Sequence, residues 1–394
     1  MDWRRCSVRV VEKRRIALAS IAVLAGFSLL AVLQRKTTGK PLDLESAPAP
    51  NGVYRTYQYG EPNTVYLGTQ PLYAPAGLIT EAMRRDPILK EELLKLGLKI
   101  TFYPFRKGYD VNMQLIPGRL QAGIGGDMPA LTAAATTNIV IPVMVQSGPT
   151  WLVTRTAVLL KDLKGKRIAY AKGSNAHFML LTLLSSEGFS ESDFELVPLD
   201  VEHMIEALET RTISAFAAWE PTPTIARQKH RSVARFGGPS SGYMYFRRDF
   251  ADKQPTALRQ IVAAVARACL WLRDGSNADR VKVAGWTIEA SEALTGAKLH
   301  LSPQALLSIG ERDILGSKWR PSFAISADSL ADNGRLGKEY AFLKEIGVLP
   351  EASLWENLHK SFDLTILSDV LANFAEYRVS EFRYAPVPIT PGDS

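Results

Sequence analysis

The sequence predicts an α/β fold of two lobes behind a single membrane segment. The chain has 394 residues, which is too long for one typical core, since single hydrophobic cores stop growing near about 250 to 300 residues. Strand-like and helix-like patterns alternate along two successive stretches, which is typical of parallel sheets with helical crossovers. An uncharged apolar run precedes them and is long enough to cross a bilayer core.

The N-terminal part is predicted to hold the chain at a membrane. Basic residues precede the apolar run 16–33 more densely than they follow it, so the positive-inside rule places residues 1–15 in the cytoplasm. The folded body then lies on the periplasmic side of the inner membrane. The run lacks a small-x-small site after it, which favours an uncleaved signal anchor, and secretion after signal cleavage is the alternative. Residues 34–62, rich in Thr, Gly, Pro and Ala, are predicted to be a linker.

Charge and cysteine content exclude several kinds of partner. The net charge is +7, but residues 1–36 hold eight Lys or Arg and two acidic residues, so the body is nearly neutral and no nucleic acid is expected. Cys6 and Cys269 lie on opposite sides of the predicted membrane segment, so no disulfide is expected. Cys269 sits in an apolar stretch typical of a buried helix. The five histidines are scattered, so neither a metal site nor a cofactor is predicted.

Two halves of the chain repeat the same order of elements. In the first half, strand patterns cover 64–69, 99–105, 122–125 and 139–145, with helix patterns over 78–95 and after 110. In the second half, strand patterns cover 167–171, 194–199 and 213–217, with helix patterns over 175–187, 202–211 and 222–229. This repetition predicts two similar lobes, each built on a parallel sheet.

Polar loops follow the first and third strands of both halves. Gln70 to Tyr73 follows the first strand, and Lys172 to Asn175 follows its counterpart. The third strands end at Asp127 and at Trp219-Glu220, each followed closely by proline. Because open α/β sheets bind ligands at the carboxyl ends of their parallel strands, these four loops are predicted to face each other across a cleft.

The stretch from Lys172 to His177 predicts an anion site. Ser174 suits the N-cap position, and apolar residues follow at helical spacing until Gly188. The free N–H groups and the dipole of such a helix start can hold an anionic oxygen, and the Asn175 amide adds a donor. The alternative is a plain capped turn between a strand and a helix.

Trp219 and Glu220 predict an apolar wall and a carboxylate for the ligand. As alternatives, Trp219 packs between the lobes and Glu220 pairs with a nearby arginine. Asp127 is equally suited to cap a helix. Tyr73 is equally suited to the surface or the core, and His177 to packing within its helix. The predicted ligand-binding residues are Gln70, Tyr73, Asp127, Ser174, Asn175, His177, Trp219 and Glu220.

Taken together, these residues resemble the substrate-binding proteins of the nitrate, taurine and alkanesulfonate importers. The resemblance extends over residues 65–342 and rests on the order and spacing of its motifs. It implies the type II periplasmic binding protein fold, with a hinge and a central cleft. It also implies a monomeric body that closes on a small organic anion and delivers it to ABC permease and ATPase subunits. The implied boundaries are 63–148 and 242–372 for lobe 1, 149–241 for lobe 2 and 373–394 for a C-terminal tail.

The resemblance favours a transport protein over an enzyme. The implied cargo is an aliphatic sulfonate, taurine or nitrate. A membrane-anchored sensor with the same binding fold is the alternative, although residues 1–15 are too few for a signalling domain. A pyrimidine-synthase-like enzyme is disfavoured, because the cysteine-rich iron motif of those enzymes is absent and so are nucleophile-elbow, P-loop and zinc motifs.

Overall fold

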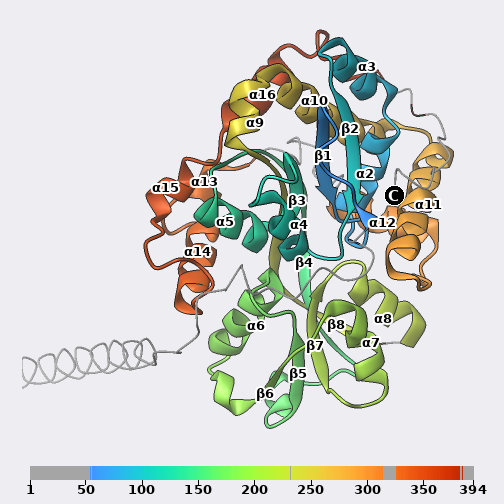
Figure 1. The fold of residues 1–394 in the computed structure, drawn as a ribbon. Helices are drawn as coiled ribbons and strands as arrows, with labels where there is room; N and C mark the ends of the chain where they lie inside the picture. Colours follow the sequence, from blue (N-terminus) through green and yellow to red (C-terminus); the bar gives the residue numbers. More distant parts are fainter. Residues whose placement is uncertain (1–53, 55, 231, 314–324, 382–383, 385–394) are drawn as a thin grey trace, which may run out of the picture. The chain divides into compact units, whose positions relative to one another are not determined.

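The computed structural model describes residues 54, 56–230, 232–313, 325–381 and 384 (Figure 1). All of these residues belong to one compact unit. The predicted membrane segment 16–33 and the cytoplasmic residues 1–15 lie outside the described residues. Within the described ranges, no helix combines the length and the apolar character needed to cross a membrane.

The first half of the unit has the predicted alternation of strands and helices. Its strands are β1 (Thr64–Thr69), β2 (Lys99–Pro104), β3 (Ala122–Gly126) and β4 (Ile139–Thr154). The helix predicted over 78–95 is two helices, because Pro87 disfavours a helical residue before it and Asp86 accepts from the N–H groups of Ile88 and Leu89 as a cap. The helices are α2 (Ala76–Arg84), α3 (Pro87–Lys95), α4 (Gly108–Leu115) and α5 (Asp127–Thr136).

The second half also confirms the predicted alternation. Its parallel strands are β5 (Arg167–Tyr170), β6 (Glu195–Pro198) and β7 (Ala215–Trp219). Its helices are α6 (Asn175–Ser186), α7 (Val201–Glu209) and α8 (Thr222–His230), and short 3-10 turns lie at Leu160–Leu163 and Glu191–Asp193. A further strand that the sequence patterns did not indicate, β8 (Val233–Arg247), then leads back to the first half.

One continuous sheet joins the two halves, in the order β2-β1-β3-β8-β4-β7-β5-β6. The prediction of two separate parallel sheets is therefore wrong in part. The pairs β1–β2, β1–β3, β5–β6 and β5–β7 are parallel, whereas β8 runs antiparallel to β3 and β4, and β4 runs antiparallel to β7. The β4–β8 ladder extends from Ile139 opposite Arg247 to Thr154 opposite Val233, and its two long strands pass from one half into the other (Figure 1).

Helices from the C-terminal part pack on the first half. The long helix α10 (Pro255–Asp274) is buried along most of its length and packs against α2, α3 and α16. Cys269 lies buried on α10, where burial raises the pKa of its thiol to about 12, so the cysteine is a core residue as predicted. The other helices are α9 (Arg248–Lys253), α11 (Asn277–Thr295), α12 (Pro303–Asp313), α13 (Ala327–Leu330), α14 (Arg335–Glu345), α15 (Trp355–His359) and α16 (Leu364–Ala372).

The end of the predicted linker belongs to the folded body. Tyr57 is buried and stacks on Tyr103 of β2, with ring centroids 4.3 Å apart. The hydroxyl of Tyr54 donates to Asp110 at 2.9 Å. An aromatic cluster of this kind fixes the chain, so a linker through residue 62 is too long at its C-terminal end.

Candidate functional site

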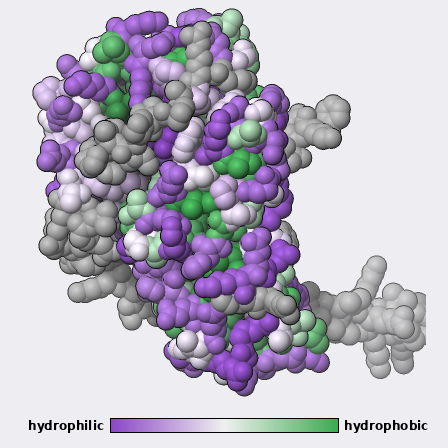
Figure 2. Space-filling model, turned by 90° about the vertical axis from the view of Figure 1, so that its right-hand side faces the viewer, coloured by the Kyte–Doolittle hydropathy of each residue, from purple (hydrophilic) through white to green (hydrophobic). Residues whose placement is uncertain are grey.

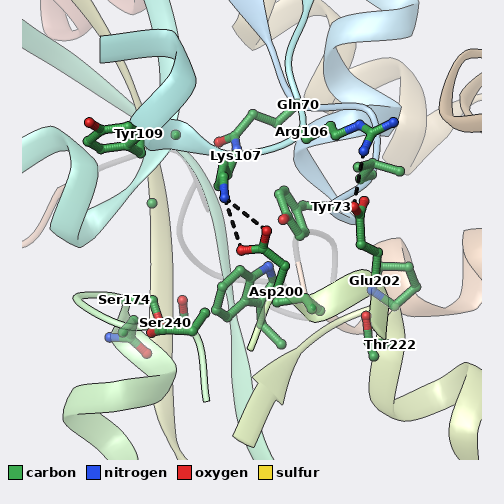
Figure 3. A pocket seen from close by; sticks show the side chains of 18 of the residues that line it. Gln70, Tyr73, Arg106, Lys107, Tyr109, Ser174, Asp200, Glu202, Thr222 and Ser240 are labelled. Carbon is green, nitrogen blue, oxygen red and sulfur yellow. Dashed lines mark hydrogen bonds and ion pairs between the residues drawn. The ribbon is translucent and has the colours of Figure 1, made fainter. Parts of the chain in front are cut away.

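A cavity of about 1130 Å³ lies where the ends of the parallel strands of both halves meet. From the first half, the loops after β1, β2 and β3 contribute to its wall. From the second half, the loops after β5, β6 and β7 do so (Figure 3). The strand-end loops therefore face one cleft, as the sequence predicts for open α/β sheets.

Six of the eight predicted ligand-binding residues line this cavity, and two do not. Neither His177 nor Glu220 is part of the wall. The six residues on the wall are Gln70, Tyr73, Asp127, Ser174, Asn175 and Trp219.

His177 is a packed interior residue, which corrects its predicted place in the site. Its ring stacks on Tyr170 at 4.3 Å between centroids and meets Phe342 edge-on at 5.1 Å. Its Nδ1 accepts from the backbone N–H of Gly173 at 3.3 Å. Burial, with the charge of Lys172, lowers its pKa to about 4, so the imidazole is neutral near pH 7.

Glu220 is also turned away from the ligand space. Its side chain is only 2% exposed and accepts from the backbone N–H of Thr224 at 3.1 Å. Its other oxygen accepts from Nη2 of Arg312 at 3.0 Å. The alternative expected from the sequence, pairing with an arginine, is the one observed.

Asp127 lies on the wall, but its charge is compensated by protein groups. Its Oδ2 accepts from Nη1 of Arg335 at 2.5 Å, from the N–H of Ser241 at 3.1 Å and from Nδ2 of Asn175 at 3.2 Å. Arg335 also donates to Glu339 at 2.9 Å, as Asn175 does at 3.0 Å. We call Asp127, Asn175, Arg335 and Glu339 the hinge cluster, because Asp127 and Asn175 come from opposite halves.

Burial raises the pKa of Glu339 well above its usual value, and the nearby Asp127 charge raises it further. Two buried carboxylates share one guanidinium in the hinge cluster, which leaves one negative charge in excess when both are ionised. Burial and the second carboxylate therefore both favour the neutral form of Glu339.

The side-chain amide of Gln70 bonds to backbone groups of the protein, so it is not free to bind a ligand. In the amide orientation that satisfies both neighbours, its nitrogen donates to the carbonyl of Ile124 at 3.1 Å and its oxygen accepts from the N–H of Gly108 at 2.7 Å. The side chain thus connects the loop after β1 to β3 and to the start of α4.

Ser174 caps helix α6 as predicted. Its hydroxyl accepts from the N–H of His177 at 3.3 Å and donates to the carbonyl of Ala171 at 2.6 Å. The N–H groups of Asn175 and Ala176 are orphan donors of the first helical turn, which has no intrahelical acceptors for them. Ser174 and Asn175 are part of the cavity wall, so the positive end of the α6 helix dipole lies at the cleft.

Charged residues that the sequence did not single out join the two halves across the cavity. Nζ of Lys107 donates to Asp200 at 2.9 Å, and Nη1 of Arg106 donates to Glu202 at 3.0 Å (Figure 3). The two bases precede α4, and the two acids lie at the start of α7. We call these two ion pairs the cleft latch. Their side chains are partly exposed, so each pair contributes modestly to closure.

Aromatic and aliphatic side chains make up much of the remaining wall. Tyr73 of the first half and Trp219 of the second lie with ring centroids 5.3 Å apart. On the face drawn in Figure 2, hydrophobic surface gathers in the middle between hydrophilic regions. Aliphatic residues on the cavity wall include Leu72, Leu199, Ile205, Ile225 and Val348.

Two α/β halves joined by paired long strands, with strand ends facing one cleft, form the kind of site in which α/β proteins enclose a small ligand. A protein-family profile described as NMT1/THI5 like matches residues 139–275. The match includes β4, the whole second half, β8 and α10. The resemblance drawn from the sequence is confirmed.

The curated relatives are named for the binding of taurine or of aliphatic sulfonates. The taurine-binding periplasmic protein of Escherichia coli is 24% identical over 228 residues, which are 53% of this chain and 71% of the relative. A putative aliphatic sulfonates-binding protein of Bacillus subtilis is 28% identical over 120 residues, 29% of this chain. That second match spans only 36% of the relative's length.

Solved structures of binding proteins share the fold. The alkanesulfonate-binding protein of Xanthomonas axonopodis pv. citri, bound to MOPS, matches with a TM-score of 0.57 at 22% identity, covering 77% of this chain and 99% of that one. The periplasmic nitrate-binding protein of Synechocystis matches with a TM-score of 0.57 at 12% identity, covering 81% and 92%. The α/β periplasmic binding protein fold is therefore confirmed.

Proposed function

We propose that this protein is the solute-binding component of an ABC importer. It captures a small organic anion, such as an aliphatic sulfonate, taurine or nitrate, and delivers it to permease and ATPase subunits. The observation that carries the proposal is the cavity between opposed strand ends, with the start of α6 on its wall. The relatives' roles in sulfonate and taurine binding agree with it.

Closure of the cleft accounts for capture. In this proposal residues 63–148 and 242–372 move as lobe 1 and residues 149–241 as lobe 2, about the long strands β4 and β8. The cleft latch forms when the lobes approach, and the ligand anion accepts from the first-turn donors of α6. The body acts as a monomer.

We also propose that residues 16–33 anchor the protein to the inner membrane, with the body in the periplasm. The apolar run and the basic residues before it support this placement. N-terminal sequencing of protein isolated from membranes tests it. A start at Met1 or Asp2 is expected, and a start near residue 34 would indicate cleavage instead.

Isothermal titration calorimetry on the full-length protein tests the binding function. We expect at least one of taurine, butanesulfonate and nitrate to bind with saturable heat. Ser174→Ala should weaken that binding, since it removes the cap that orders the start of α6. Ser276→Ala, which removes the matching N-cap of α11 outside the cavity, should leave affinity unchanged. Equal affinity of both variants would contradict the placement of the anion at α6.

A further inference from the structure

We infer that helix α14 is a brace that holds α6 against the first half and limits how far the cleft opens when no ligand is bound. In this role Phe342 is a positioning residue, because it acts on the start of α6 and not on the ligand. This role rests on the closing motion proposed above and not on the identity of the solute.

One side of α14 is fixed to the first half. Nη1 of Arg335 donates to Asp127 of α5. Its Nη2 donates to the hydroxyls of Ser241 at 2.8 Å and Tyr243 at 3.1 Å, on the part of β8 that pairs with β3 and β4. Leu343 of α14 is fully buried in a core cluster that includes residues of α4 and α5. We therefore expect α14 to move with the first half when the lobes separate.

The other side of α14 lies against the first turn of α6, in the second half. Oε1 of Glu339 accepts from Nδ2 of Asn175 at 3.0 Å. The ring of Phe342 meets His177 at 5.1 Å and Phe178 at 5.3 Å between centroids. Figure 1 shows α14 and α6 on the left of the molecule and α7, which carries the acids of the cleft latch, on the right. The brace therefore joins the halves at a different place from the cleft latch.

The brace extends to the cavity wall through the turn that follows it. Val348 comes shortly after the end of α14, and its Cγ2 lies 3.7 Å from the position that a Cβ atom at Gly173 would occupy. Both residues line the cavity. A movement of α6 away from the brace therefore separates two parts of the wall at the start of α6.

Separation should occur between α14 and α6 rather than between α14 and the first half. The pair of Arg335 with Asp127 is buried, and a buried charge without its partner is costly. Aromatic contacts and the hydrogen bonds of one amide cost less to break. Oε2 of Glu339 and Oδ1 of Asn175 are buried without a hydrogen-bond partner among the described residues. Water that enters on opening can bond to both atoms, which lowers the cost of release further.

Contacts that exist only while α6 lies on α14 favour the closed arrangement of the lobes. A protein with two arrangements responds to the loss of such contacts by a shift of its population toward the other arrangement. Loss of one aromatic contact changes the ratio of the two by roughly two- to tenfold. Without the Phe342 ring, the ligand-free protein should therefore be open more often. A ligand that binds the closed form should bind more weakly in proportion.

Pulsed electron paramagnetic resonance on the dialysed, ligand-free, full-length protein tests the brace by measuring the distance between two spin labels. The labels are attached through Gln228→Cys on α8 of the second half and Glu289→Cys on α11, which packs on α2 of the first half. Both positions are exposed and outside the cavity wall. Cys6→Ser removes one native cysteine, and Cys269 is protected because it is buried.

Phe342→Ala should shift the population from the shorter to the longer label distance and lower the ratio of the two by roughly two- to tenfold. Phe342→Leu keeps an apolar side chain at this position and should shift the population less. Tyr340→Ala, on the same helix, is the matched control. The Tyr340 ring contacts Trp355 and its hydroxyl donates to Ser353, both in the C-terminal part, so the label distances should remain those of the wild type.

Unchanged label distances in Phe342→Ala would overturn the inference, and so would an equal shift in Tyr340→Ala. A merely structural Phe342 would lower the midpoint of thermal unfolding without changing the distances. If Phe342→Ala does not fold, Phe342→Leu decides, since unchanged distances in that variant would also contradict the brace. No ligand takes part in this measurement. Failure of every tested solute to bind would therefore count against the importer function and not against the brace.

Discussion

Nη1 of Arg335 lies 2.5 Å from Oδ2 of Asp127, although 208 residues separate the two positions in the chain. Asp127 starts α5 at the end of a strand, and Arg335 starts α14 in the C-terminal part. The carboxylate on the cavity wall therefore owes its charge balance to a helix that contacts both α5 of the first half and α6 of the second.

Loss of the Arg335 charge should destabilise the fold. Arg335→Met leaves the fully buried Asp127 and Glu339 without their cation, and breaking a buried pair costs about 3 to 5 kcal/mol. Urea denaturation at pH 7 measures the difference. Arg273→Met removes an exposed pair with Asp274 and should change the free energy of unfolding by less than about 1 kcal/mol. Similar costs for both variants would show that the hinge cluster is not a buried ion cluster in solution.

The raised pKa of Glu339 should make the free energy of unfolding fall as pH rises. A raised pKa in the folded state means that the contribution of Glu339 is fully present below its usual pKa of 4.5 and is lost as pH rises through the raised value. The charged groups that face it are Asp127 and Arg335. The Gln side chain of Glu339→Gln stays neutral at every pH. The free energy of unfolding of this variant, relative to that of the wild type, should therefore increase from pH 4.5 to pH 8. Denaturation at several pH values measures it, and a constant difference would contradict the prediction.

His177 should make the free energy of unfolding fall as the pH is lowered. Its pKa falls from 6.5 to about 4 on folding, so the unfolded chain binds the additional proton and stability is lost as pH falls through this window. The loss amounts to at most about 3 kcal/mol. His177→Phe retains the ring contacts with Tyr170 and Phe342 and should flatten the profile between pH 6.5 and 4. The control is His300→Asn, at an exposed position. In this variant the free energy of unfolding should depend on pH as it does in the wild type.

The cleft latch should affect ligand affinity in a salt-dependent way. Lys107→Ala removes one of its two partly exposed pairs and should weaken a verified ligand by about two- to fivefold at 50 mM NaCl. The difference from the wild type should disappear near 500 mM NaCl, because salt screens exposed charges. Lys99→Ala removes an exposed pair with Glu61 within the first half and should have no effect at either concentration. An effect of Lys107→Ala that persists at high salt would mean direct contact with the ligand.

The sequence predicts the cleft because strand ends are local features. Gln70, Asp127 and Trp219 each follow a short apolar run, and parallel strands bring such ends together whatever the details of packing. His177 also had a local signal that pointed elsewhere. It stands three and seven positions before Leu180 and Leu184, which places it on the buried face of α6 with them.

The arginine partners of the buried carboxylates could not be predicted from local sequence patterns. Arg335 and Arg312 reach Asp127 and Glu220 from helices far along the chain, and a local pattern does not specify which carboxylate an arginine will meet. β8 was missed because Gly237, Gly238 and Pro239 read as a turn, and only its pairing with β4 makes this stretch a strand. The cleft latch could not be predicted from local patterns either, because Lys107 and Asp200 are 93 residues apart.

The β4–β8 ladder also affects how this protein can change over evolution. The chain enters the second half along one strand and leaves it along the partner strand, and Thr154 and Val233 stand opposite each other at the far end. Entry and exit points that are neighbours allow the intervening stretch to be exchanged as a cassette without moving the ends of the host. Ligand preference can then shift by recombination of one wall of the cleft, while the other wall and its C-terminal helices are inherited unchanged.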